Sequence, residues 1–227
     1  MFNHIDTFHE LFQTKLKRID SPTGRKYLLE GKEISFPSVT TVLSFISAPG
    51  IAKWRKRVGE EAANRKSKHA STRGTRLHTC FEHHLNNTSV ETLDEYKVPL
   101  IKLMFGAAKS RLNSRIDNIY QQETQMYSER LGLAGTVDLI CEFDGELAVV
   151  DFKTSEKVKQ EKYLDNYFVQ LSAYWAMFSE KTGLVPKKLV VFLVTESGEI
   201  QIVEKRNPLH YLAKLRDYVN QFNSHHA

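Results

Sequence analysis

The feature that most restricts the fold of this chain is the apolar segment VDLICEFDGELAVVDFKTS, residues 137–155. Strand-forming residues fill both halves of the segment, and Asp144-Gly145 lies between them. An Asp-Gly pair favours a two-residue type I′ turn, because both residues tolerate a positive φ. The segment therefore predicts a β-hairpin with strands over residues 134–143 and 146–153.

Counting outward from this turn predicts which residues of the hairpin face each other. Phe143 faces Glu146, and the same count places Asp138 opposite Asp151. Directly opposed residues have Cβ atoms about 4.5–5.5 Å apart. Lys153 shares the face of Asp151 because strand side chains alternate. We therefore expect two carboxylates and one ammonium group at the end of the hairpin away from its turn.

Two interpretations of this charged cluster are open from the residues alone. Like charges that face each other destabilise a sheet, and burial would raise the pKa of one aspartate or require a cation. Lys153 supplies one positive charge for the two negative charges of Asp138 and Asp151. A hard divalent cation binds carboxylate oxygens. The apolar surroundings favour a metal site, whereas the charge pattern also fits a structural salt-bridge cluster on a solvated sheet edge.

The rest of the chain places helices before the hairpin, and helices alternating with strands after it. We expect a hairpin turning at residues 21–24, a short helix VTTVLSFI capped by Ser38 and ending at Pro49-Gly50, helices over residues 51–68, 73–86 and 96–116, a strand over 118–128, a helix over about 165–181, strands at 187–195 and 199–205, and a last helix from Asn207-Pro208. This order is typical of an α/β (α+β) fold, a central mixed sheet flanked by helices. We predict an N-terminal hairpin and basic helical region over residues 1–72 and a core over residues 73–227.

Composition excludes several classes of protein. The 227 residues carry a formal net charge of +5, which fits nucleic acid as a partner. Cys80 and Cys141 are too few and too far apart for a disulfide framework, a zinc finger or an iron–sulfur cluster. No window reaches the ~18 apolar residues of a membrane span, and the first residues lack a signal-peptide core. We expect a cytoplasmic protein that is not secreted and does not bind membranes.

Several short motifs resemble the PD-(D/E)xK nuclease superfamily in its RecB-type form. G-T-V-D at residues 135–138, followed by D-F-K-T-S at residues 151–155, is similar to the nuclease signature. RGTRLH, which ends at His78, looks like the helix that brings a metal-binding histidine to these sites. FVQLSAYWAMF, with Gln170 and Tyr174, resembles the Q-x-x-x-Y pattern of the helix after the signature.

The resemblance covers about residues 25–195 and implies a restriction-endonuclease-like core that hydrolyses phosphodiester bonds with Mg²⁺ or Mn²⁺. It assigns Lys153 to orient the attacking water and to stabilise charge on the phosphate, with Gln170 and Tyr174 beside it. The metal ligands implied are His78, Asp138, Asp151 and the main-chain carbonyl of Phe152. Glu123 stands where many relatives carry an acidic strand residue, and Glu82 would orient His78. The chain lacks the four cysteines of the iron–sulfur branch, so no cluster is expected.

Taken without the resemblance, several of these residues also fit ordinary structural roles. His78 fits a hydrogen-bonded core histidine, and Tyr174 fits packing between a helix and the sheet. The basic run over residues 51–76 fits a solvated face, although we hypothesise that it grips DNA phosphates, with Trp54 as a base-stacking platform. The expected phosphate contacts are Arg55, Lys56, Arg57, Arg73 and Arg76.

The function expected is therefore that of a metal-dependent DNA exonuclease acting on single-stranded DNA or DNA ends, in replication, repair or recombination. The preference for an exonuclease follows from FPSVTTVLS, which is similar to a segment of the branch that holds the mitochondrial genome maintenance exonuclease and its phage and bacterial relatives. That branch suggests a bacterial or phage-infected host cell. An endonuclease on the same core and a non-catalytic DNA-binding protein are the alternatives.

Overall fold

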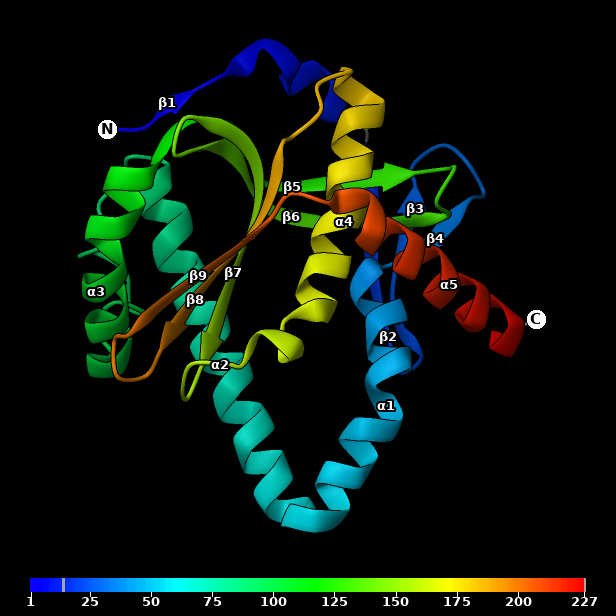
Figure 1. Cartoon of the computed structure of the whole chain (residues 1–227), viewed down its shortest axis with the longest axis horizontal. Helices are drawn as coiled ribbons and strands as arrows, with labels where there is room; N and C mark the ends of the chain where they lie inside the picture. Colours follow the sequence, from blue (N-terminus) through cyan, green and yellow to red (C-terminus); the bar gives the residue numbers. More distant parts are fainter. Residues whose placement is uncertain (14, 227) are drawn as a thin grey trace.

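A six-stranded mixed sheet forms the centre of the computed structural model, which describes residues 1–13 and 15–226 (Figure 1). The strands are β1 (Asn3–His4), β5 (Ile116–Ser128), β6 (Leu133–Phe143), β7 (Glu146–Ser155), β8 (Lys188–Thr195) and β9 (Ile200–Lys205), in that spatial order. β1 runs parallel to β5 and β7 parallel to β8, and the other neighbours are antiparallel. β8 is buried along its whole length, as expected of a strand covered on both faces.

Helices cover both faces of this sheet. α4 (Asp165–Thr182), α5 (Pro208–His226) and the first turns of α1 (Val39–Val58) pack on one face, and α2 (Glu60–Leu85) and α3 (Pro99–Arg115) pack on the other. Short 3-10 helices lie at Asp6–Phe12 and Glu161–Tyr163. The prediction of a central mixed sheet flanked by helices is confirmed. No helix in the described ranges is apolar over enough of its length to cross a bilayer.

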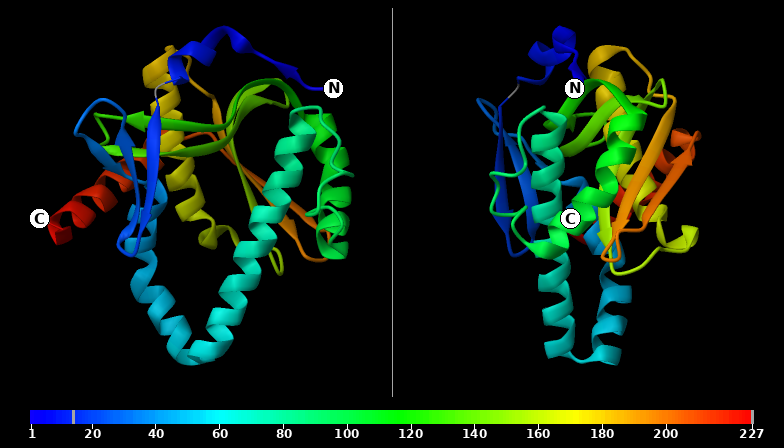
Figure 2. Two further views of the ribbon diagram at one scale, coloured as in Figure 1. Left: turned by 180° about the vertical axis from the view of Figure 1, so that it is seen from behind. Right: turned by 90° about the vertical axis from the view of Figure 1, so that its left-hand side faces the viewer.

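A second, three-stranded sheet lies against the far end of β5 and β6 (Figure 2). It consists of β2 (Leu16–Ser21), β3 (Gly24–Leu29) and β4 (Ser35–Pro37). Its inner side buries Leu16, Tyr27, Leu29 and Phe36 against Ala134. The turn predicted at residues 21–24 is confirmed, whereas β1 and β4 have no counterpart in the sequence prediction, because two or three residues carry too little periodicity.

The helical N-terminal region differs from the prediction. Ser38 caps α1 as expected, by accepting from the N–H of Thr41, but the helix does not end at Pro49-Gly50. Proline fixes φ at a helical value and removes one donor, and α1 continues through it to Val58. The break falls at Gly59, whose φ of 86° and ψ of 146° are accessible essentially to glycine alone.

α1 and α2 therefore form a V whose corner, at Gly59, projects away from the sheet (Figure 2). The boundary predicted between residues 72 and 73 falls inside α2, which is one continuous helix over Glu60–Leu85. α2 thus joins the basic N-terminal region to the core without a linker.

The Asp-Gly hairpin has the predicted turn and register. Asp144 and Gly145 have φ values of 50° and 72°, and pairing runs from Phe143↔Glu146 to Leu139↔Val150. The ladder ends there, one pair before Asp138 and Asp151, so the direct pairing predicted for these two aspartates does not form.

The ladder ends because β6 changes course at Asp138. Leu139 packs in the core under α2 and α3, whereas Val137, two residues earlier, packs in the core under α4. Residues two apart in a regular strand share a face, so the chain must twist sharply between them. Before Asp138, β6 pairs with β5, and Ala134 forms one further bridge with Ser38. The two strands swing away from β7 together (Figure 1).

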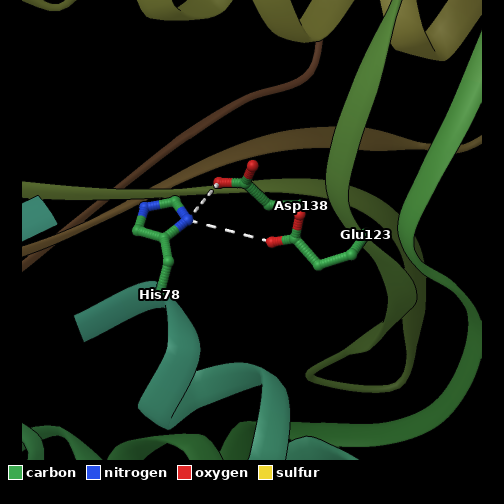
Figure 3. A group of neighbouring side chains, drawn as sticks. All are labelled: His78, Glu123 and Asp138. Carbon is green, nitrogen blue, oxygen red and sulfur yellow. Dashed lines mark ion pairs between the residues drawn. The ribbon is translucent and has the colours of Figure 1, made fainter. Parts of the chain in front are cut away.

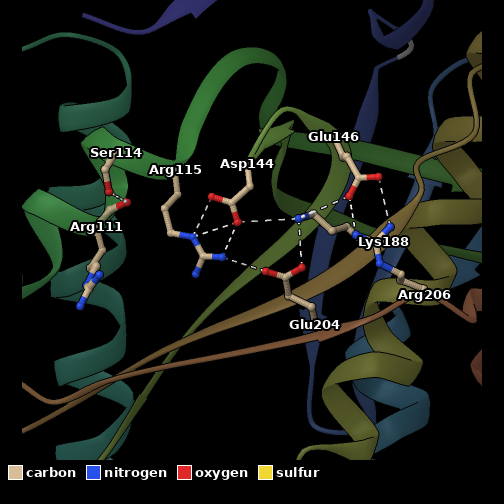
Figure 4. A network of polar contacts seen from close by, with 8 residues as sticks. All are labelled: Arg111, Ser114, Arg115, Asp144, Glu146, Lys188, Glu204 and Arg206. Atoms are coloured by element: carbon tan, nitrogen blue, oxygen red, sulfur yellow. Dashed lines mark hydrogen bonds and ion pairs between the residues drawn. The ribbon is translucent and has the colours of Figure 1, made fainter.

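An ion network centred on the buried Lys188 ties the turn of this hairpin to the sheet (Figure 4). Lys188 of β8 is 2% exposed, and its Nζ lies 3.0 Å from Glu204 and 3.9 Å from both Asp144 and Glu146. Arg115 pairs with Asp144 and with Glu204, and Arg206 pairs with Glu146. The network thus connects α3, the hairpin turn, β8 and β9.

Candidate active site

The site forms where β6 leaves β7. The Oδ2 atom of Asp138 accepts a hydrogen bond of 2.8 Å from the main-chain N–H of Phe152. This bond replaces a ladder bond at the position where pairing has ended. The main chain of β7 therefore holds the Asp138 carboxylate in place.

Glu123 lies next to Asp138 on the neighbouring strand. The pairs Gln122↔Leu139 and Thr124↔Val137 flank it, so Glu123 stands opposite Asp138 across the β5–β6 ladder. Its φ is 45°, an uncommon value for a residue with a side chain. Such backbone conformations persist where the surroundings enforce them and are concentrated at functional sites.

His78 reaches both carboxylates from α2 (Figure 3). Its Nε2 atom lies 2.7 Å from the carbonyl oxygen of Phe152; because a carbonyl only accepts, this contact assigns the proton to Nε2. Nδ1 then faces the two carboxylates, 3.7 Å from Asp138 and 3.9 Å from Glu123, and is the atom that can bind a metal once it loses its proton. The Phe152 carbonyl orients His78 through this hydrogen bond, and its role as a metal ligand stays a prediction.

His78, Glu123 and Asp138 form a group that fits a metal ion. One ligand atom from each lies within 4.8 Å of the others. Imidazole nitrogen and carboxylate oxygen are donors that suit Mn²⁺, and the carboxylates also suit Mg²⁺. Glu82 lies outside the group; its carbonyl accepts from the side chain of Gln122.

Asp151 lies beside this group on β7, not within it. It is 1% exposed, and its Oδ1 atom accepts from Nζ of Lys153 at 2.5 Å and from Nε2 of Gln170 at 3.2 Å. Its Oδ2 atom is buried and has no hydrogen-bond partner among the residues that the structure describes. An orphaned buried carboxylate oxygen is costly, and a cation next to it would remove that cost.

The electrostatics of the site favour the uptake of positive charge. Burial, with the nearby charge of Asp138, raises the pKa of Asp151 to about 6. Burial alone would lower the pKa of His78, but the charge of Asp138 and the contact with Glu123 outweigh it and raise this pKa to about 9. Burial also raises the pKa of Glu123. Protons therefore occupy the site where a divalent ion would compete with them.

Tyr174 is placed by the G-T-V-D segment. The tyrosine is 2% exposed, and a Cβ atom on Gly135 would lie 2.7 Å from its hydroxyl oxygen. Glycine at position 135 thus allows α4 to bring Tyr174 against β6. Gln170 sits one turn earlier on α4 and bonds Asp151, so its contact is with the carboxylate and not with Lys153.

Some of the residues predicted to bind DNA are exposed, and others form ion pairs within the protein. Lys56 and Arg57 are exposed near the corner of the V, and Trp54 and Arg76 are half-buried. Arg55 donates to Glu60 and Asn64 across that corner.

Arg73 is unsuited to the predicted contact with DNA. It is 5% exposed and pairs with Glu196. It shares the core-facing stripe of α2 with Leu77 and Phe81, at helical spacing. It presents no charge to solvent.

Sequence reasoning missed a cavity of about 230 Å³ beside the metal-binding group. Arg18, Arg25 and Tyr27 of the small sheet line it, together with residues of the site that include Glu123, Asp138, Gln170 and Tyr174. Strand alternation over residues 16–20 places Arg18 on the side of buried Leu16, which was the available signal. The local sequence does not predict which part of the molecule lies against this side of β2.

Comparison with known proteins agrees with this geometry. The profile of the PD-(D/E)XK nuclease superfamily matches residues 38–225. The human protein mitochondrial genome maintenance exonuclease 1 is 28% identical over 157 residues, which cover 65% of this chain and 45% of that protein. The chain thus spans less than half the length of this relative.

A crystal structure of a protein described as an exonuclease from Eubacterium rectale is similar with a TM-score of 0.47 and 15% identity, over 67% of this chain and 65% of that one. The family profile covers most of the chain, including every element that carries the site. The chain belongs to the PD-(D/E)XK nuclease superfamily.

Proposed function

We propose that this nuclease is a metal-dependent deoxyribonuclease that uses Mg²⁺ or Mn²⁺ and digests single-stranded DNA or DNA ends as an exonuclease. The observation that carries the proposal is the convergence of His78, Glu123 and Asp138 beside Asp151, whose buried Oδ2 atom has no partner within the described residues. The similarity to the human maintenance exonuclease supports the exonuclease mode. Replication, repair or recombination is the setting we propose.

The residues of the site divide the work of hydrolysis between them. His78, Glu123, Asp138 and Asp151 would hold the metal, which when bound supplies an acidified water and neutralises charge on the phosphoryl oxygens. Lys153 brings an ammonium group to the charge that develops on the phosphate. Burial alone would lower the pKa of Lys153, but Asp151 and Asp138 outweigh it and raise it, so the amine stays protonated. Gln170 positions Asp151 through its side-chain N–H.

The exposed cations around the corner of the V would bind the phosphates of the strand. Lys53, Lys56 and Arg57 are exposed there, and Trp54 beside them offers a surface for base stacking. Arg55 supports this surface through its bonds across the corner.

One assay separates the proposal from its alternatives. Labelled linear and circular single strands are incubated with Mg²⁺ or Mn²⁺, with and without EDTA. An exonuclease digests only the linear strand, and EDTA stops it. Cutting of the circle would identify an endonuclease, and binding without cutting would identify a DNA-binding protein.

Replacing Asp151 with asparagine should abolish cutting while the fold remains intact. Asparagine keeps the shape of the side chain and removes the buried charge, so we expect kcat to fall by about 10²-fold or more with no loss of thermal stability. Asp117→Asn, an exposed position on β5, is the matched control. If Asp151→Asn cuts DNA at the normal rate, the site is wrongly assigned.

A further inference from the structure

The inner side of the small sheet changes from apolar to charged as it approaches the active site. Leu16 pairs with Leu29, Arg18 with Tyr27, and Asp20 with Arg25. Alternate residues of a strand share a face, so these six residues form one continuous surface. Its Leu16–Leu29 end is buried in the core, and its other end carries three charges.

One carboxylate orients both arginines of this surface. Asp20 accepts from Nε of Arg18 at 2.9 Å and from Nε of Arg25 at 2.8 Å. Both bonds use Nε, which leaves the Nη nitrogens at the far end of each guanidinium for another acceptor. A guanidinium held in this way presents a planar pair of donors that matches a phosphate.

Both arginines line the cavity that also reaches the metal-binding group. Arg18 and Arg25 stand on its small-sheet side, and Asp138 and Glu123 stand on its other side. The cavity of about 230 Å³ has room for a phosphate group with part of its sugar. A contact between Tyr27 of the small sheet and Thr136 of β6 connects the two sides. The hydroxyl oxygens of these residues lie 3.2 Å apart.

We propose that Arg18 and Arg25, oriented by Asp20, form a clamp for the DNA phosphate that neighbours the scissile one. The three side chains carry a net charge of +1, which matches one phosphodiester. The clamp would offset the repulsion between the acidic site and the strand, and it would set the register of the scissile bond. This inference rests on the proposed nuclease function and adds a positioning role that none of the motifs assigns.

The test replaces single phosphates of a linear single strand with neutral methylphosphonates, one position at a time. Two quantities are measured for each strand: the binding affinity in EDTA and the single-turnover cleavage rate with Mg²⁺. In the wild-type protein, one position other than the scissile phosphate should weaken both by about 10-fold or more, the size of a lost charged hydrogen bond.

Arg25→Met should lower both quantities on the all-phosphate strand by a similar factor and should show no further loss at that position. Arg18→Met should give the same result. Arg25→Lys should retain part of the affinity and of the cleavage rate, because lysine keeps the positive charge but lacks the planar pair of donors of a guanidinium. The matched control is Lys26→Met, on the outer side of β3 opposite Ile19. Thermal melting of each variant confirms that it folds.

The outcomes separate this inference from the nuclease proposal. Equal losses at every position in wild-type protein and Arg25→Met would refute the clamp, and so would a loss for Lys26→Met as large as that for Arg25→Met. A dependence on Arg25 that appears only for strands with a terminal phosphate would also refute it. A protein that cuts no DNA but shows the coupling in binding affinity would retain Arg18 and Arg25 as a phosphate-binding pair and would refute the proposed nuclease activity.

Discussion

At the scale of single residues, the protons bound by His78 and Asp151 make the stability of the fold depend on pH. The pKa of His78 is raised from 6.5 to about 9 and that of Asp151 from 3.8 to about 6. Folded-state pKa values above the unfolded ones mean that stability is lost as the pH rises through these ranges. A bound divalent ion would replace the protons, so its effect on stability should grow with pH.

We therefore predict that Mg²⁺ or Mn²⁺ raises the melting temperature more at pH 9 than at pH 6. The measurement is thermal unfolding with and without the ion at both pH values. His78→Gln should reduce this difference, because His78 has the highest pKa of the side chains that would bind the ion. An ion-induced shift that is the same at both pH values would contradict the prediction.

Gly135 is the residue on which the placement of Tyr174 depends. Gly135→Ala would bring a methyl group to 2.7 Å from the tyrosine hydroxyl, and overpacking of this kind costs about 1–3 kcal/mol. We expect lower stability in urea and slower cutting, because Tyr174, Gln170 and Asp138 line one cavity. Gly106→Ala in α3, where a Cβ meets nothing within 4 Å, is the control and should stabilise the fold slightly. Wild-type behaviour of Gly135→Ala would refute this account.

At the scale of elements, the V of α1 and α2 is where we expect the protein to contact DNA away from the site. Its corner depends on Gly59, and exposed cations gather on α1 next to it. The arms lead back to the site, because α2 carries His78 and the start of α1 packs against α4.

Replacing Lys53, Lys56 and Arg57 with glutamine should weaken DNA binding and flatten its salt dependence. Each phosphate that the protein no longer neutralises lowers the slope of log K against log salt by about 0.7 for a single strand. The matched control removes three exposed charges from α3, at Lys102, Lys109 and Arg111. An unchanged slope in the first variant, or an equal change in both, would exclude α1 as the phosphate-binding helix.

At the scale of the whole molecule, the Lys188 network holds four elements in one arrangement. Lys188→Met should lower the free energy of unfolding by about 1–3 kcal/mol, because Glu204 loses a charged hydrogen bond while Arg115 still pairs with Glu204 and Asp144. The measurement is urea unfolding. The double variant Lys188→Met with Glu204→Gln should recover part of the loss, and a single variant as stable as wild type would show that the network carries no net stability.

The local sequence was enough to predict the turn of the hairpin, the pairing of the strands next to that turn, and the helix now seen as α4. These predictions held for the fold because a turn type and a strand register depend on neighbouring residues alone. The roles of Asp138, Asp151 and Lys153 in the site stay a prediction. The helix break was predicted at Pro49 and formed at Gly59, because a proline removes one donor, whereas the corner requires a backbone conformation that glycine alone adopts readily.

By itself the sequence determined the pairing near the Asp-Gly turn and the capped start of α1. It also supplied the carboxylates, the lysine and the histidine from which a site could form. Only the tertiary structure decided that Glu123 joins His78 and Asp138 while Asp151 stands apart with Lys153 and Gln170. It also decided that Arg18 and Arg25 meet the same cavity. The physical reason is that these contacts join residues far apart in the chain, and packing of whole elements, not local alternation, sets which faces meet.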